Sequence, residues 1–286
     1  MTLFFLRIFA KFAIWLRYRV HLRGLEDIKK LGNKSIIFLP NHPCLMDPVI
    51  VSTMLMKDFK PRALVTEKQV RTTPLRYLRK QLRILEIPDL GIVGKTGFDK
   101  VEKQITSCVD ALRNGDNVLL YPAGRIYRSR FEDLRANGGV KRIIEMYPEV
   151  RIVLVRTRGL WGSSFGRAKG YQTSFIETIV SNLKALLSNF IFFMPRRDVT
   201  IELVNCPDDF PKNADKETIN RYLEAFYNEN APQNHVPPAA ADLAAHRGER
   251  GQARQRPLCR ALPHFHSDAE DGDRQRDHGL GRRPRL

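Results

Sequence analysis

Cysteine is scarce in this sequence, and the cysteines present are not placed to cross-link the chain. The 286 residues contain four, with no CxxC spacing among them: Cys44, Cys108, Cys206 and Cys259. Disulfide-rich scaffolds and zinc sites depend on closely spaced cysteines, so neither is expected. The sequence therefore favours a reducing compartment and predicts no metal site and no bound cofactor.

Long uninterrupted apolar runs are also missing. Residues 1–20 alternate short apolar stretches with single cations, and a helix would place Arg7, Lys11 and Tyr18 on one face. The stretches are too short to cross a bilayer, and no small-residue cleavage site marks a signal peptide. We predict a membrane-interface helix over 1–20, with a terminal helix packed on the domain as the alternative. The apolar run within 175–194 is likewise broken by polar residues and is a second candidate for membrane contact.

Acidic residues are too few to balance the basic ones. The chain has 48 Lys and Arg against 31 Asp and Glu, a formal net charge of +17. Such a surface attracts nucleic acid, membrane phospholipid or a phosphorylated substrate. The cations flank apolar segments, and neither an aromatic–basic platform nor a recognition helix is evident, so no nucleic acid is expected. We predict a phospholipid membrane as partner, with the protein peripheral or monotopic on the cytoplasmic face of the cell membrane.

Lysine disappears from about residue 231 onward. The segment 231–286 has ten arginines, many alanines, prolines and glycines, and no periodic apolar face. A segment of this composition cannot bury enough apolar surface to offset its lost conformational entropy. We therefore predict a disordered tail over 231–286 and a folded domain over 21–230.

Within the predicted domain, short apolar runs alternate with helical patterns. The runs typical of strands span 18–25, 36–39, 63–66, 85–88, 117–121, 151–156 and 198–204. The patterns typical of helices span 49–56, 74–82, a segment ending at 113, 139–147 and 215–227. Strands that alternate with helices indicate an α/β fold. We predict a single mixed, largely parallel sheet flanked by helices.

A histidine and an aspartate lie where the predicted strand 36–39 leads into a helix. Asn41 and His42 follow the strand, and Asp47 comes five residues after the histidine. Neutral imidazole accepts a proton near pH 7, and a carboxylate on its other nitrogen orients the ring and stabilises the imidazolium. The pattern predicts a general base, with a loop histidine beside a helix-capping aspartate as the alternative. Cys44 in the same loop could act as a nucleophile, although a small half-buried residue is the commoner role of free cysteine.

A second strand end carries a cluster of cations. The predicted strand 117–121 is followed by Pro122 and then by a loop that opens with a glycine, Gly124. The next six residues hold three arginines: Arg125, Arg128 and Arg130. Guanidinium groups match phosphate oxygens in pairs, so the loop is a candidate phosphate clamp. A solvated basic loop is the alternative.

Through the motifs at these two strand ends, the sequence resembles the glycerolipid acyltransferase family, which includes 1-acyl-glycerol-3-phosphate acyltransferases. The first block of that family is Asn-His-x4-Asp, and here it is matched by Asn41, His42 and Asp47. The third block corresponds to Tyr121-Pro122-Ala123-Gly124, and the fourth block corresponds to residues 152–155 and Gly159. The order and spacing of the blocks agree over about residues 20–227.

The sequence departs from the family pattern in two blocks. Ala123 stands where the third block has a glutamate, and Arg125-Ile126 stands where it has a threonine–arginine pair. The second block normally carries a phosphate-holding arginine, whereas this chain offers lysines, among them Lys95. Residues 125–130 and 160–165 are most similar to the 2-acylglycerophosphoethanolamine acyltransferase branch. These departures concern the acceptor rather than the reaction.

The resemblance implies transfer of a fatty acyl group from acyl-CoA or acyl carrier protein to the hydroxyl of a lysophospholipid such as 1-acylglycerol-3-phosphate. In this reading His42 is the general base and Asp47 orients it. Asn41 and Gly124 stabilise the oxyanion or position the site, and the residues expected to bind the acceptor phosphate are Arg125, Arg128 and Lys95. The alternative is a catalytically silent membrane-surface lipid-binding protein with the same fold.

Overall fold

The computed structural model of the chain describes residues 2–66, 70–71, 79, 83–87, 95–135, 137–168, 175–188 and 196–231. These residues belong to one compact unit, 1–240. Most of the predicted helix 74–82 and the predicted tail beyond Ala231 lie outside the described residues.

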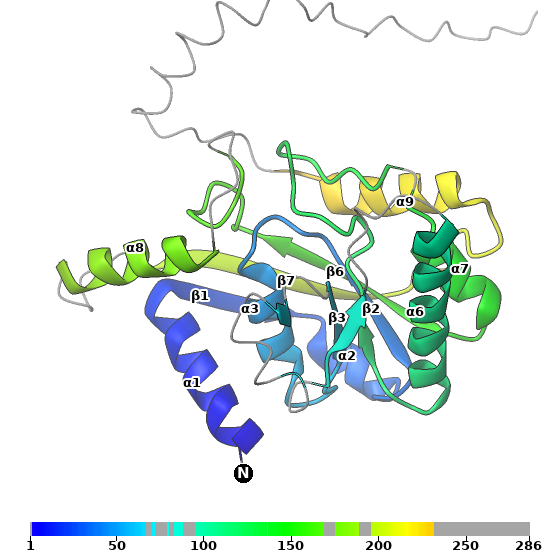
Figure 1. Ribbon diagram of the computed structural model, residues 1–286, viewed down its shortest axis with the longest axis horizontal. Coiled ribbons are helices and arrows are strands. Elements are labelled where there is room, and N and C mark those ends of the chain that lie inside the picture. The colour runs from blue at the N-terminus through cyan, green and yellow to red at the C-terminus, as the bar shows by residue number, and fades with distance from the viewer. Residues whose placement is uncertain are drawn as a thin grey trace, which may run out of the picture. The chain divides into compact units, whose positions relative to one another are not determined.

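Strands and helices alternate along the described chain, close to the positions that the apolar pattern predicts (Figure 1). In chain order they are α1 (Thr2–Arg17), β1 (Tyr18–Arg23), α2 (Leu25–Lys30), β2 (Ile36–Pro40), α3 (Asp47–Leu55), β3 (Arg62–Thr66), β4 (Leu85–Ile87), α6 (Lys95–Arg113), β5 (Val118–Leu119), α7 (Gly139–Met146), β6 (Arg151–Arg158), α8 (Phe175–Ser188), β7 (Arg197–Asn205) and α9 (Lys216–Asn228).

A seven-stranded sheet organises the domain, with the strand order β1-β7-β6-β2-β5-β3-β4. The central strand β2 pairs in parallel with both neighbours, so that Ile37 lies opposite Ile152 of β6 and Val118 of β5. Strands β3 and β4 extend the parallel part, whereas β7 is antiparallel to β6 and parallel to β1. The predicted fold class, a single mixed and largely parallel sheet flanked by helices, is confirmed. Because β2, β5 and β6 run in the same direction, the loops that follow them meet at one edge of the sheet.

The two faces of the sheet are covered by different helices. Successive side chains of β2 point to opposite faces. Ile37 and Leu39 pack with buried residues of α6, α7 and α9, whereas Ile36 and Phe38 pack with buried residues of α1, α2 and α3. Each of these side chains stabilises the fold by about 1.5–3 kcal/mol relative to an exposed position. Burial on both faces explains why the sequence shows an unbroken apolar run here.

Residues 18–20, which the sequence pattern includes both in the predicted helix over 1–20 and in the predicted strand over 18–25, belong to the strand in the structure. Helix α1 ends at Arg17, and β1 begins at Tyr18, which is buried and pairs with Arg197 of β7. Tyr18 therefore lies in the sheet and does not share a helix face with Lys11. Residues 18–20 are part of the edge strand β1 because they pair in parallel with residues of β7.

The loop after β6 begins with a glycine that the backbone requires. Gly159 has φ +89°, and a Cβ at this position would overlap the carbonyl group of Asp198 in β7. The chain then packs against the loop after β2, where the Leu45 N–H donates to the Phe165 carbonyl at 3.1 Å. The end of β6 thereby supports the loop that carries the predicted base.

Candidate active site

His42 and Asp47 meet at the end of the central strand. Strand β2 ends at Pro40, which places Asn41 and His42 in the following loop, and α3 begins at Asp47. His42 Nδ1 lies 3.0 Å from Asp47 Oδ1 and 3.2 Å from Asp47 Oδ2. The Asp47 side chain is completely buried, whereas 13% of the His42 side chain is exposed. The structure thus brings together the two residues that the sequence spacing singles out, and only the histidine reaches solvent.

This contact fixes the tautomer that the neutral histidine needs. A carboxylate can accept a hydrogen bond from Nδ1 only if Nδ1 carries the proton. The Nε2 atom of the neutral ring is then left as the proton acceptor. The arrangement can therefore perform general base catalysis.

The surroundings make His42 a stronger base than free imidazole. Burial lowers the pKa of His42, but the charge and hydrogen bond of Asp47 and the charge of Glu132 outweigh it, and the net pKa is raised. Burial raises the pKa of Asp47 to about 6, although the nearby His42 acts in the opposite direction. Of these two shifts, the raised pKa of His42 is the one that decides how the pair is protonated. Loss of its proton would leave the Asp47 carboxylate isolated in a buried site, and isolated buried charges are costly.

Asn41, expected to stabilise the oxyanion or to position the site, makes hydrogen bonds within the fold. Its side chain is buried, and its amide group donates hydrogen bonds to the Tyr127 hydroxyl at 2.6 Å and to the Thr157 carbonyl at 3.0 Å. Its Oδ1 accepts a hydrogen bond from the Thr157 N–H at 2.7 Å. Both amide hydrogens are engaged, so the structure favours a positioning role for Asn41 over direct contact with an oxyanion.

Cys44 is a poor nucleophile in this environment. Its side chain is fully buried, and its Sγ accepts a hydrogen bond from the Met46 N–H at 3.3 Å. Burial, and secondarily the charge of Asp47, raise the pKa of the thiol to about 12. The residue is therefore a thiol rather than a thiolate near neutral pH.

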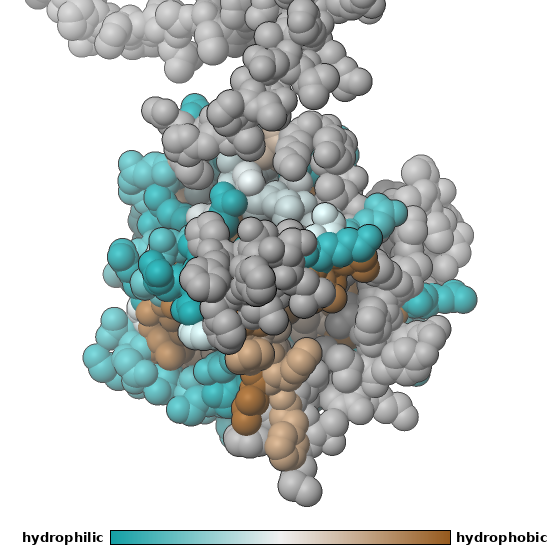
Figure 2. Space-filling model, turned by 90° about the vertical axis from the view of Figure 1, so that its left-hand side faces the viewer, coloured by the Kyte–Doolittle hydropathy of each residue, from teal (hydrophilic) through white to brown (hydrophobic). Residues whose placement is uncertain are grey.

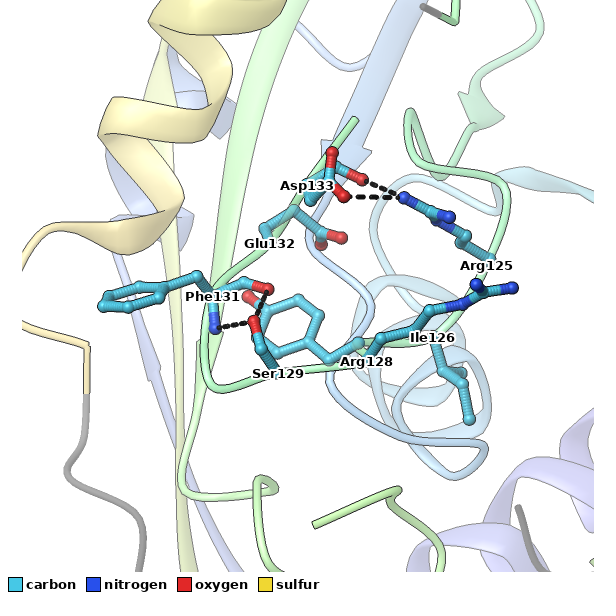
Figure 3. Close-up of a pocket in the computed structure, with 8 residues that line it drawn as sticks. Arg125, Ile126, Arg128, Ser129, Phe131, Glu132 and Asp133 are labelled. Carbon is cyan, nitrogen blue, oxygen red and sulfur yellow. Dashed lines mark hydrogen bonds and ion pairs between the residues drawn. The ribbon is translucent and has the colours of Figure 1, made fainter. Parts of the chain in front are cut away.

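The arginine-rich loop after β5 lines a small cavity. Gly124 begins the loop with φ +62°, and its N–H donates to the Tyr121 carbonyl at 3.0 Å. Arg125 and Arg128 line a cavity of about 30 Å³, room for roughly one water molecule. Arg125 donates to both the carbonyl and the carboxylate of Asp133 at 3.0 Å, as Figure 3 shows. An acceptor phosphate at Arg125 must therefore compete with Asp133.

The predicted phosphate ligands are only partly assembled in the described structure. Arg125 and Arg128 share the cavity, and the Arg128 side chain is exposed. Lys95 is the first residue of α6, and its side chain lies outside the described part of the chain.

Glu132 is a site residue that the sequence does not reveal. It lies in the same loop, only 4% exposed, and its Oε2 accepts a hydrogen bond from the His42 N–H at 2.7 Å. The His42 carbonyl accepts from the Tyr127 N–H at 2.9 Å, so the loop holds His42 through both of its backbone polar groups. Ninety residues separate Glu132 from His42. Neither helical nor strand periodicity marks the contact, so no local signal identifies Glu132.

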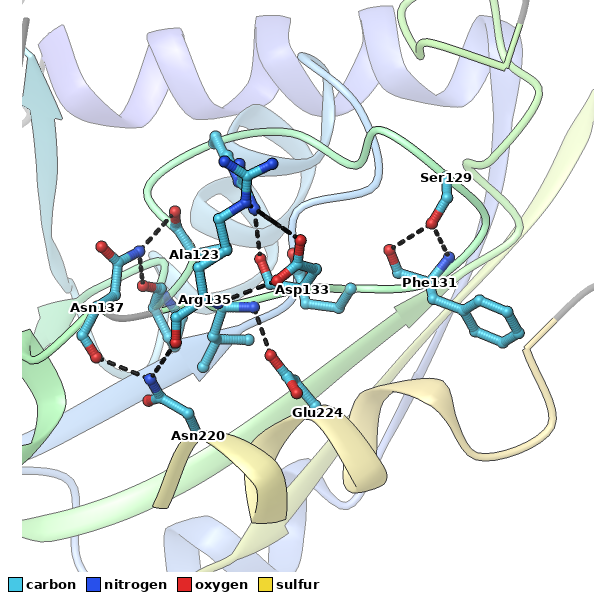
Figure 4. Close-up of polar contacts among 12 residues, drawn as sticks. Ala123, Ser129, Phe131, Asp133, Arg135, Asn137, Asn220 and Glu224 are labelled. Atoms are coloured by element: carbon cyan, nitrogen blue, oxygen red, sulfur yellow. Dashed lines mark hydrogen bonds and ion pairs between the residues drawn. The ribbon is translucent and has the colours of Figure 1, made fainter. Parts of the chain in front are cut away.

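Helix α9 holds this loop through a row of polar side chains. Glu224 accepts a hydrogen bond from the Leu134 N–H at 2.6 Å, and Asn220 donates to the carbonyl groups of Arg135 and Asn137 at 2.9 Å each. Asn137 in turn donates to the Ala123 carbonyl at 2.8 Å (Figure 4). The position of the loop therefore depends on a helix near the end of the described chain.

Helices α1 and α8 both expose apolar side chains, and those of α1 include aromatic rings. Among the side chains that the structure describes, the exposed large apolar ones are Phe5, Ile8, Phe9, Phe12 and Trp15 on α1, and Ile179, Val180 and Leu183 on α8. Figure 2 shows apolar side chains on the lower part of one face, where Figure 1 places α1. The Arg196 guanidinium lies 3.8 Å from the centre of the Trp15 ring. No helix in the described part of the chain is long and apolar enough to span a bilayer.

Comparison with known proteins connects this geometry to one reaction class. Residues 19–156, which contain both strand-end loops, match the family model described as Acyltransferase. The fold is similar to the crystal structure of the 1-acyl-sn-glycerophosphate (LPA) acyltransferase, PlsC, from Thermotoga maritima. The TM-score is 0.52 at 17% sequence identity, over 85% of this chain and 80% of that chain. No curated protein matches the chain.

These findings support the resemblance to glycerolipid acyltransferases. They also favour an enzyme over the silent lipid-binding protein that was the alternative. The match to the Acyltransferase family model covers residues 19–156, and together with the fold it supports an O-acyltransferase.

Proposed function

We propose that the protein transfers a fatty acyl group from a thioester, either acyl-CoA or acyl carrier protein, to the hydroxyl of a lysophospholipid. The observation that carries this proposal is the His42–Asp47 pair, 3.0 Å apart at the sheet edge within the acyltransferase domain. A buried carboxylate on one imidazole nitrogen, with the histidine still partly exposed, is the arrangement that activates a hydroxyl group.

In the proposed reaction His42 Nε2 accepts the proton of the acceptor hydroxyl as its oxygen attacks the thioester carbonyl carbon. The new C–O bond gives a tetrahedral intermediate, which collapses with cleavage of the C–S bond. The imidazolium returns its proton to the departing thiolate, so the products are an ester and a free thiol. Asp47 keeps Nδ1 protonated throughout and stabilises the positive charge on the ring.

We propose a phosphate-bearing acceptor, with Arg125, Arg128 and Lys95 as its ligands. Arg125 and Arg128 lie in the loop that also holds His42, so a phosphate bound by these arginines and the reacting hydroxyl can belong to one small molecule. Arg125 would exchange its Asp133 contact for the phosphate, because guanidinium binds phosphate through paired hydrogen bonds. Acceptors of this class include 1-acylglycerol-3-phosphate and 2-acylglycerophosphoethanolamine.

We further propose that the protein works at the cytoplasmic face of the cell membrane. The exposed aromatic and aliphatic side chains of α1 and α8 suit insertion into the headgroup region, and the basic surface suits anionic phospholipid. Lysophospholipids and long-chain thioesters are themselves amphipathic, so a membrane-bound enzyme meets its substrates where they accumulate.

Thiol release tests the reaction directly. The full-length protein in membranes is mixed with palmitoyl-CoA or palmitoyl carrier protein and with each acceptor, and both the free thiol and the diacyl product are measured. Replacing His42 by Ala should lower turnover by about 10²–10⁴-fold, the usual contribution of a general base.

The chain offers a matched control for this substitution. His21 Nε2 lies 3.4 Å from Asp198 Oδ1, a second histidine–aspartate pair, but both side chains are more than half exposed. His21→Ala should keep wild-type turnover. If His42→Ala retains substantial turnover under the same conditions, His42 is not the base.

A further inference from the structure

The backbone of His42 is held by one loop from both sides. Its N–H donates to Glu132 Oε2 at 2.7 Å, and its carbonyl accepts from the Tyr127 N–H at 2.9 Å. With both backbone groups fixed, the imidazole can move only by rotation of its side chain, and Asp47 restrains that rotation. The geometry of the proposed base therefore depends on where Glu132 lies.

Glu132 is in turn fixed by one side chain of α9. The Asn228 Oδ1 atom accepts a hydrogen bond from the Glu132 N–H at 2.7 Å, and Asn228 Nδ2 donates to the Glu132 carbonyl at 2.9 Å. A single amide thus satisfies both backbone polar groups of Glu132, 96 residues away in the sequence. Asn228 lies beyond residue 156, where the match to the acyltransferase family ends.

Glu132 places a carboxyl group in a buried position, which is unfavourable unless the group has a specific contact to make. Its neighbour Arg125 pairs with Asp133, and the Glu132 carboxylate accepts a hydrogen bond from the His42 N–H. Burial raises the pKa of Glu132 to about 8, partly offset by the His42 hydrogen bond. Burying a carboxyl group costs stability, and a functional contact is a common reason that such a group is present.

We propose that Glu132 and Asn228 are positioning residues that hold His42 in the orientation needed for proton transfer. The proposal rests on the role of His42 as the base. Helix α9 lies outside the matched family region. It therefore contributes to the active site through successive contacts, from Asn228 to Glu132 and from Glu132 to the His42 backbone.

Substitutions at both positions test this chain of contacts in the full-length protein. Glu132→Ala removes the acceptor of the His42 N–H, whereas Glu132→Gln keeps an oxygen that can accept it. Asn228→Ala releases the Glu132 backbone. Turnover of palmitoyl-CoA or palmitoyl carrier protein with 1-acylglycerol-3-phosphate is measured as kcat and KM per mole of folded protein, alongside the thermal midpoint.

We expect Glu132→Ala and Asn228→Ala to lower kcat by about 10–100-fold with KM changed less than about threefold, because small misplacements of a catalytic group cost this much. Glu132→Gln should recover most of the lost kcat. The double Ala variant should be no slower than Glu132→Ala alone, because Asn228 acts on His42 only through Glu132. Arg221→Ala is the control, since Arg221 is an exposed α9 residue whose side chain donates to Thr218 of the same helix, and this variant should keep wild-type kcat.

The inference is overturned if Asn228→Ala and Glu132→Ala keep wild-type kcat per folded protein, even if their thermal midpoints fall. It is also overturned if Glu132→Gln loses as much kcat as Glu132→Ala. His42→Ala separates this result from failure of the proposed function. An inactive His42→Ala beside a fully active Asn228→Ala removes only the positioning role, whereas an active His42→Ala removes the role of the base itself.

Discussion

Asn41 and Thr157 are joined as if they were paired residues in the sheet. Asn41 Oδ1 accepts from the Thr157 N–H at 2.7 Å, and Asn41 Nδ2 donates to the Thr157 carbonyl at 3.0 Å. A side chain on the loop after β2 thereby uses both backbone polar groups of a residue in β6. The contact ties the start of the catalytic loop to the neighbouring strand, one residue before His42.

Asn41→Ala should destabilise the fold by about 2–4 kcal/mol, because it leaves buried backbone groups of Thr157 and the Tyr127 hydroxyl without their partner. Urea unfolding followed by circular dichroism measures this change. Asn114→Ala, at an exposed position after α6, is the control and should change stability by less than about 0.5 kcal/mol. Equal stability of Asn41→Ala and wild type would show that these hydrogen bonds do not support the loop.

Cys44→Ala should keep most of the acyl-transfer activity. The thiol is fully buried, and its pKa of about 12 leaves almost no thiolate at neutral pH. The measurement is thiol release, together with a search for acyl label on the protein after mixing with a radioactive acyl thioester. A labelled acyl-enzyme that forms on wild type and disappears in Cys44→Ala would assign the nucleophile to Cys44.

Charged residues on the exposed face of α1 should weaken membrane binding without changing the fold. Phe9 and Phe12 are 69% and 54% exposed, so Phe9→Asp with Phe12→Asp removes apolar contact with lipid and adds repulsion from anionic headgroups. Co-sedimentation with vesicles of phosphatidylglycerol and phosphatidylethanolamine measures the binding.

The matched control is Leu31→Asp, an exposed apolar position directly after α2. This variant should bind vesicles like wild type. Unchanged binding of the Phe9 and Phe12 double variant would exclude α1 as the membrane contact.

Glu132→Gln should alter the pH dependence of stability in a defined direction. The pKa of Glu132 is 4.5 in an ordinary environment and about 8 in the folded protein. Between these values unfolding releases a proton, so this group makes the wild type less stable as pH rises. Glutamine does not ionise, and the stability of the variant relative to wild type should therefore increase from pH 5 to pH 8. Thermal midpoints at the two pH values measure this, and a constant difference between the proteins would contradict a raised pKa at Glu132.

Much of the fold can be predicted from the sequence because its signals are local. The apolar run 36–39 becomes the central strand β2, and the segment predicted as a helix over 215–227 becomes α9, capped by the Asp215 side chain, which accepts from the Thr218 N–H at 2.8 Å. The His42–Asp47 contact spans five residues, so the turn between strand and helix is enough to bring them together.

The supporting part of the site depends on contacts between distant parts of the sequence. Glu132 reaches His42 across 90 residues, and Asn228 reaches Glu132 across 96. Both contacts follow from sheet order and from where α9 packs, and neither leaves a periodic signal. The contacts of Asn41 could not be predicted from the sequence for a different reason. The same amide could donate to an oxyanion or to the Thr157 backbone, and only the pairing of β2 with β6 decides between these partners.

The pH dependence of kcat/KM for thiol release, compared between wild type and Asp47→Asn, tests the central role of His42 most directly. His42 must be neutral to accept a proton, so activity is lost as pH falls below its pKa, which Asp47 and Glu132 raise above 6.5 against the effect of burial. We expect Asp47→Asn to move the acid limb to lower pH than in the wild type while reducing the maximal rate. Asp198→Asn, at the exposed His21 pair, should leave the profile unchanged. An acid limb at the same pH in wild type and Asp47→Asn, with equal maximal rates, would contradict a base oriented by this aspartate.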